Sequence, residues 1–132
     1  MRRCRCMFIV ASTVCLLVVA VAAQKAARFK YDPASETKIT GVVEEVKEYQ
    51  CPVSGTLGYH LVLRSGEQLH VIHVAASKFL RDYEIEFAKG EQLEVLGVKV
   101  KLESGEEGIM AREIKRGQNT YAFRDKDGNP LW

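Results

Sequence analysis

The sequence predicts a mainly β domain, a five-stranded Greek-key barrel with one helix between its third and fourth strands. Three observations support this fold class. Short segments alternate apolar and polar residues, as half-buried strands do. Glycine-containing turns separate these segments. One stretch between the third and fourth strand patterns instead spaces its apolar residues with the period of a helix.

Residues 1–23, which precede the barrel, have the pattern of a secretory signal peptide. Three arginines near the start are followed by an apolar run over residues 7–19 and then by small residues to Ala23. The run is shorter than the roughly 20 residues that cross a bilayer. We therefore expect cleavage after Ala22 or Ala23, a periplasmic or secreted protein, and no stable membrane span after cleavage. A retained membrane anchor is the alternative.

Cleavage changes the composition of the chain. The full sequence has 19 basic and 17 acidic side chains and a formal net charge of +2. Loss of residues 1–23 removes three arginines, so the remainder has 16 basic side chains and a charge of −1. Three of the four cysteines leave with the same segment, and Cys51 remains alone. No disulfide can form within the remainder, so its own core must stabilise it.

One domain, residues 37–132, follows a polar extended leader over residues 24–36. The first strand pattern loses its strict alternation after Val43, which indicates a β-bulge. Ser65-Gly66 indicates a tight hairpin between the second and third strands. The expected strands cover residues 37–47, 59–64, 67–74 and 91–102 and a fifth segment from Ile109, with a sixth extended piece at 120–124.

The segment 75–90 contains the predicted helix. Ala75, Phe79 and Tyr83 lie four residues apart and form an apolar stripe. Three meandering strands, a helix and a hairpin are the chain order of an OB-fold, with an SH3-like barrel and a small α+β sandwich as alternatives. The tail ends in Trp132, which we expect to bury its ring against one barrel end.

The sequence favours a binding protein over an enzyme. It contains no GxSxG, CxxC or HExxH motif. Nucleic acid is disfavoured as a partner because phosphate binding needs a basic surface. The chain after cleavage is slightly acidic, and the predicted loop over residues 103–108 contains three glutamates.

The second and third strands bear the candidate binding face. With Ser65-Gly66 as the turn, His60 and His73 lie diagonally on one side, with their backbones about 7–8 Å apart. The side that contains His70 is more apolar and should point into the barrel. The opposite, outer face is where OB-folds commonly bind ligands. Its candidate ligand-binding residues are His60, Val62, Arg64, Leu69, Val71 and His73.

Cys51 lies in the loop that joins the first two strands, next to this face. A thiolate and two imidazoles at one surface can hold zinc or copper, or bind the iron of a cofactor. Cys51, His60 and His73 are therefore candidate metal ligands. The alternative is that both histidines are ordinary polar residues of a half-exposed face.

The strand order, export signal and small size resemble the periplasmic OB-fold family of the BOF type. Four segments carry a closer resemblance, namely GYHLVL (58–63), HVIHVAASKFL (70–80), KGEQLEVLG (89–97) and RDKDGNPLW (124–132). They are similar to exported bacterial proteins related to the OB-like domain of the magnetosome proteins MamS and MamX. The CxxCH haem-attachment motif of some magnetosome proteins is absent, so the resemblance implies no haem-based electron transfer.

Together these features predict an exported, non-enzymatic OB-fold binding module whose partner is an envelope protein or a small ligand. The first alternative is a periplasmic protein that handles a metal ion or redox chemistry through Cys51, His60 and His73. The second, disfavoured by charge, is a nucleic-acid-binding OB domain.

Overall fold

The structure is a computed structural model that describes residues 29–102 and 105–132. The expected signal peptide, residues 1–23, lies outside the described residues, and export remains a prediction. Within the described residues, no helix is both long and apolar enough to cross a membrane.

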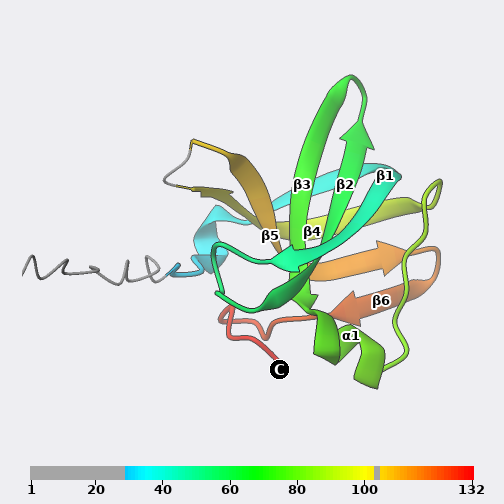
Figure 1. Cartoon of the computed structure of the whole chain (residues 1–132). Helices are drawn as coiled ribbons and strands as arrows, with labels where there is room; N and C mark the ends of the chain where they lie inside the picture. The colour runs from blue at the N-terminus through cyan, green and yellow to red at the C-terminus, as the bar shows by residue number, and fades with distance from the viewer. Residues whose placement is uncertain (1–28, 103–104) are drawn as a thin grey trace, which may run out of the picture.

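The described residues form the predicted mainly β OB-fold (Figure 1). The strands pair in the order β3-β2-β1-β4-β5-β6, and all these pairings are antiparallel. A parallel pairing of β3 with β5 closes the first five strands into a barrel. The elements are η1 (Pro33–Ser35), β1 (Thr37–Gln50), β2 (Leu57–Ser65), β3 (Gln68–Ala76), α1 (Ser77–Asp82), β4 (Gln92–Lys101), β5 (Glu107–Arg116) and β6 (Asn119–Ala122).

β1 pairs with two different strands because it is long and bends near its middle. Its first half pairs with β4 and its second half with β2, and the pairing with β2 shifts between Val43 and Glu45. The expected β-bulge is therefore confirmed. Just before it, the backbone of Gly41 lies so close to the Arg64 carbonyl group that a Cβ could not fit. A glycine is needed where the strand turns from one side of the barrel to the other.

The hairpin register differs from the prediction by one residue pair. Ser65 pairs with Gln68, so the turn residues are Gly66 and Glu67 rather than Ser65-Gly66. Gly66 has a φ of 61°, and the first position of a hairpin turn often requires such a positive angle. Because the pairing shifts by an even number of residues, each side chain keeps its predicted face.

The helix is shorter than the apolar stripe predicts. Ala75 pairs with Tyr59, which makes it part of β3 instead of the helix. At the other end Glu84 has a φ of 54°, a left-handed conformation that stops helical hydrogen bonding. Tyr83 is 67% exposed, so the predicted stripe is not a fully buried face.

The core fills the barrel interior. Leu61, Leu63, Ile72 and Val74 point inward from the β2–β3 hairpin, as their phase predicts. Trp132 differs from the expectation, because 40% of its surface stays exposed. It contacts Phe79 of α1, with a distance of 6.0 Å between the ring centroids. In Figure 1, α1 and the C-terminus lie at the same end of the molecule.

Candidate metal site

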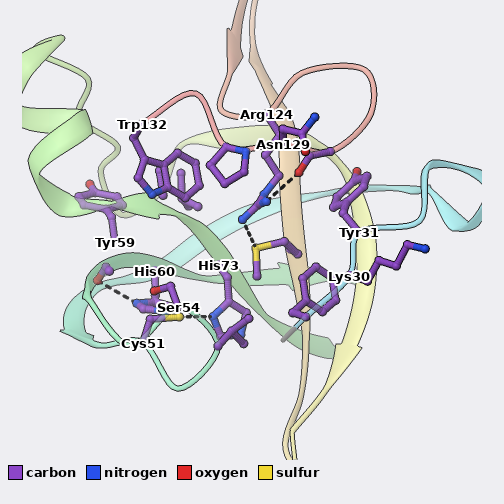
Figure 2. Close-up of a pocket in the computed structure, with 18 of the residues that line it drawn as sticks. Lys30, Tyr31, Cys51, Ser54, Tyr59, His60, His73, Arg124, Asn129 and Trp132 are labelled. Atoms are coloured by element: carbon purple, nitrogen blue, oxygen red, sulfur yellow. Dashed lines mark hydrogen bonds between the residues drawn. The ribbon is translucent and has the colours of Figure 1, made fainter. Parts of the chain in front are cut away.

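Three potential metal ligands meet at the end of the barrel that bears the C-terminus. Cys51 directly follows β1, His60 belongs to β2 and His73 to β3. All three are buried, with 4%, 1% and 4% of their surfaces exposed. Their ligand atoms all lie within 4.8 Å of one another. Figure 2 shows the three side chains side by side at one edge of a pocket.

The β1–β2 loop holds Cys51 in place through its own backbone. The Cys51 amide donates to the Thr56 carbonyl oxygen at 2.8 Å, and the Gly55 amide donates to the Cys51 carbonyl oxygen at 2.7 Å. Gly55 has a φ of 73°, which favours glycine. The loop is therefore a closed turn that returns the chain to β2 with the sulfur facing the two histidines.

His60 has one ring nitrogen hydrogen-bonded and the other free. Nδ1 lies 2.9 Å from the Gly58 carbonyl oxygen. Since a carbonyl oxygen only accepts hydrogen bonds, Nδ1 must bear the hydrogen and donate it. In the neutral ring, Nε2 then has a lone pair that can accept a hydrogen bond or bind a metal ion. Nε2 is buried and has no hydrogen-bond partner among the residues that the structure describes. The Tyr49 ring stacks on the His60 ring, with 3.8 Å between the ring centroids and an interplanar angle of 10°. Metal-binding histidines commonly have this arrangement, in which the second nitrogen donates to a backbone carbonyl.

His73 completes the cluster from the neighbouring strand. Its Nδ1 lies 3.5 Å from the Cys51 sulfur. The two imidazole rings meet edge to face, with 4.8 Å between their centroids. A Cβ on Gly108 would lie 2.9 Å from His73 Nε2, and one on Gly58 would lie 2.7 Å from His60 Cε1. Two glycines thus leave the space that the rings occupy.

The environment favours the thiolate form of Cys51. Burial by itself raises the pKa of the thiol, but polar contacts with His60, His73 and Ser54 outweigh it and lower the pKa from 9.0 to about 4. The thiolate is the form of cysteine that binds metals.

A pocket of about 500 Å³ opens beside the three residues. Arg124 lines it and is 9% exposed, and burial lowers the pKa of its guanidinium. In Figure 2 this side chain lies across the pocket from the cluster. The other labelled lining residues come from the leader, the β1–β2 loop, β2 and the tail, namely Lys30, Tyr31, Ser54, Tyr59, Asn129 and Trp132.

The structure divides the six residues of the predicted binding face. His60 and His73 oppose each other directly, instead of diagonally, because of the shifted register. The other four lie farther along the hairpin, outside the pocket that contains the histidines. Val62 and Leu69 border a separate shallow hollow, Arg64 forms an ion pair with Glu44, and half-buried Val71 pairs with Gly108.

His70 does not join the cluster and is not enclosed by the barrel. It is half-buried in another hollow, beside Lys99 and Glu107, because β3 reaches the open end of the barrel there. The predicted inward direction holds for Ile72 and Val74, which are farther along the strand.

Sequence reasoning missed the opposite wall of the pocket. The sequence pattern predicts Arg124 only as part of an extended piece, and it predicts no binding role for Met110. The sequence signal for this wall is the turn that follows Arg124. In this turn the Asp125 carboxylate accepts hydrogen bonds from the Asp127 and Asn129 amides. This turn brings the tail back so that Arg124 bridges to Pro130 in the manner of a strand.

Comparisons with known proteins agree with this fold. Residues 35–121 match the MamS/MamX magnetosome protein family. Among curated proteins no sequence match was found. Two crystal structures of the S. cerevisiae mitochondrial single-stranded DNA-binding protein Rim1 are similar, each at 14% identity over 69% of this chain and 98% of Rim1, with TM-scores of 0.50 and 0.49. At this identity the likeness concerns the fold alone.

Proposed function

The chain belongs to the MamS/MamX magnetosome protein family, and from the site its OB-fold carries we propose that it is an exported, non-enzymatic binding module for a thiophilic transition-metal ion, zinc or copper. The ligands are Cys51 Sγ, His60 Nε2 and His73 Nδ1. One thiolate and two imidazoles favour such ions over magnesium or calcium, which prefer oxygen ligands.

The spacing of the donor atoms suits this role. With usual zinc bond lengths, a tetrahedral site places sulfur and nitrogen about 3.5 Å apart and two nitrogens about 3.4 Å apart. The Cys51 sulfur already lies 3.5 Å from His73 Nδ1. The ligand atoms all lie within 4.8 Å of one another, so side-chain movements of roughly 1 Å would bring them to the distances of a tetrahedral site.

The observation that carries the proposal is the unpartnered Nε2 of His60. Leaving a buried acceptor unsatisfied costs about 1–3 kcal/mol, so such atoms usually have a partner. The hydrogen bond from Nδ1 to Gly58 fixes the lone pair on Nε2. A metal ion among the three donors would provide the missing partner, and the pocket would leave its fourth position open.

Metal titration tests this proposal. The purified chain, before and after removal of residues 1–23, is titrated with Zn²⁺ and Cu⁺ against competing chelators, with metal content measured by elemental analysis. We expect one ion per chain. The double variant His60→Ala/His73→Ala should lose about 100-fold or more in affinity. His70→Ala is the matched control, because this histidine is on β3 but outside the cluster, and it should bind like the wild type.

Equal, weak uptake by the wild type and the double variant would rule out the metal site. N-terminal sequencing of the protein recovered from its native host tests export separately. A start after Ala22 or Ala23 supports it, whereas Met1 on membrane-free protein contradicts it.

A second candidate, binding of an envelope protein, depends on a different surface. Leu69 is 58% exposed and borders a hollow with Val62 and the carboxylates of Glu44 and Glu45. Capture of a specific partner from envelope extracts, undisturbed by chelator but lost in Leu69→Asp, would support it. Capture that chelator abolishes would instead favour the metal site.

A further inference from the structure

Arg124 is a buried cation without a carboxylate partner among the described residues. Arg112 pairs with Glu36 and Arg116 with Glu91, although both of these arginines are more exposed than Arg124. Among residues 29–102 and 105–132, no carboxylate forms an ion pair with Arg124. Buried charges in proteins are normally paired, because an uncompensated one is costly to desolvate. The described residues therefore leave the guanidinium of Arg124 without a carboxylate counterion.

The guanidinium of Arg124 is held in a fixed orientation with donors to spare. Nη1 donates to the Gly128 carbonyl oxygen at 2.8 Å and Nη2 to the Met110 sulfur at 3.2 Å. The rings of Tyr31 and Trp132 lie 5.9 and 5.1 Å from its central carbon. Five N–H donors are available in a guanidinium, and Nε of Arg124 has no partner within the described part of the chain. Such a preorganised group suits a planar anion.

Arg124 lines the same pocket as the candidate ligands Cys51, His60 and His73. A metal ion on these three ligands would add positive charge to the pocket that already contains the guanidinium. This step rests on the proposed metal binding. Metal loading would increase the need for an anion at the same pocket.

We propose that the metal-loaded pocket binds a small carboxylate with an apolar body, the carboxylate lying between Arg124 and the open side of the metal. The volume of about 500 Å³ lies within the range of small-molecule sites. Phe29, Val53 and Trp132 provide apolar surface for the body. Asp127 also lines the pocket, but its carboxylate pairs with Lys126.

The chain contains a natural reporter for this binding. Trp132 is its single tryptophan and lines the pocket. The zinc-loaded and metal-free full-length protein is titrated with benzoate and with benzyl alcohol, its neutral counterpart, with tryptophan fluorescence and calorimetry as readouts. We expect benzoate to bind the zinc form about tenfold or more tightly than benzyl alcohol. Benzoate should also bind the zinc form more tightly than the metal-free form.

Two variants test the role of Arg124. Arg124→Gln should weaken benzoate binding about tenfold or more while zinc affinity is retained. Arg81→Gln removes an exposed arginine of α1 that pairs with Glu48, and should leave benzoate binding unchanged. If Arg124→Gln does not fold, as judged by circular dichroism, the comparison of benzoate with benzyl alcohol in the wild type still tests whether the pocket binds a carboxylate.

Equal binding of benzoate and benzyl alcohol, or benzoate binding that Arg124→Gln leaves unchanged, would overturn the carboxylate site. Zinc content measured on the same samples keeps the two proposals apart. A chain that takes up no zinc contradicts the metal site. Its metal-free titration then still supports or overturns recognition of the carboxylate by Arg124.

Discussion

The β2–β3 hairpin presents one outer face along its length, but the two ends of that face have different surroundings. At one end, where β3 leads into α1, His60 and His73 are buried. Figure 1 shows α1 beside the C-terminus. At the other end, near the turn, Arg64 is exposed and Leu69 is 58% exposed. Alternation along a strand determines which side chains share a face. What covers that face determines which of them become a site.

The covered end depends on segments that are distant in the sequence. The β1–β2 loop, the leader and the tail all contribute residues to the pocket there. Their cover removes water from the two imidazoles, so the polar atoms need partners inside the protein. At the uncovered end water satisfies the same kinds of groups, and no such demand arises.

Replacement of the Cys51 sulfur should give the largest difference in metal affinity between variants at the covered and uncovered ends of the face. Cys51→Ser removes the soft ligand, so zinc or copper affinity should fall about 100-fold or more. Leu69→Ala at the uncovered end should leave that affinity unchanged. Competition titration measures both. Comparable losses in the two variants would mean that the cluster is not the binding site.

Crowding at the covered end should reduce stability. A Cβ in Gly108→Ala would lie 2.9 Å from both His73 Nε2 and the Val71 carbonyl oxygen. We expect the free energy of unfolding to fall by about 1–3 kcal/mol, because the backbone or the imidazole must move. Urea denaturation measures this. Gln68→Ala, an exposed change near the turn, should alter stability by less than about 0.5 kcal/mol.

The leader that covers the pocket should loosen at low pH. Glu36 binds Arg112, and the Tyr31 hydroxyl donates to Glu36 at 2.8 Å. The hydrogen bond from Arg112 is the main cause that holds the pKa of Glu36 below its ordinary value of 4.5. A carboxyl with a lowered pKa in the folded state stabilises the fold above pH 4.5, and this contribution is lost as the pH falls further.

Glu36→Gln should therefore cost about 1 kcal/mol at pH 7 and less at pH 3. Urea denaturation at the two pH values gives the difference. Glu67→Gln, an exposed change in the β2–β3 turn, serves as the control for general effects of acid. An equal cost of Glu36→Gln at both pH values would show that the ion pair does not anchor the leader.

The smallest effect should come from the uncovered end. Arg64 and Glu44 form an ion pair there with half and a third of their side-chain surfaces exposed. Exposed pairs contribute little because water screens them, so Arg64→Ala should change stability by less than about 1 kcal/mol. Thermal denaturation at low and high salt measures it. A larger loss would mean that this end is less open to solvent than its exposure indicates.

Local patterns in the sequence predict most of the barrel and half of the site. Alternation places Leu61 and Ile72 inside and His60 and His73 together outside, and a shift of the turn by one residue does not change this. The length of the helix was overestimated because Ala75 has a partner in β2, which no helical periodicity reveals. Arg124 was missed for a related reason, since a return of the tail over the barrel depends on long-range packing.

The separation of the ligands along the chain bears on the order of folding. Cys51 and His73 are only 22 residues apart, and consecutive antiparallel strands bring them together. Arg124 follows all five strands of the barrel in the sequence, and the pairing of β3 with β5 closes that barrel. Because short loops close at lower entropic cost, we expect the β1–β3 meander to form first. An ion that binds this meander would nucleate the barrel, and its release rate would then report on global unfolding and not on local fluctuation.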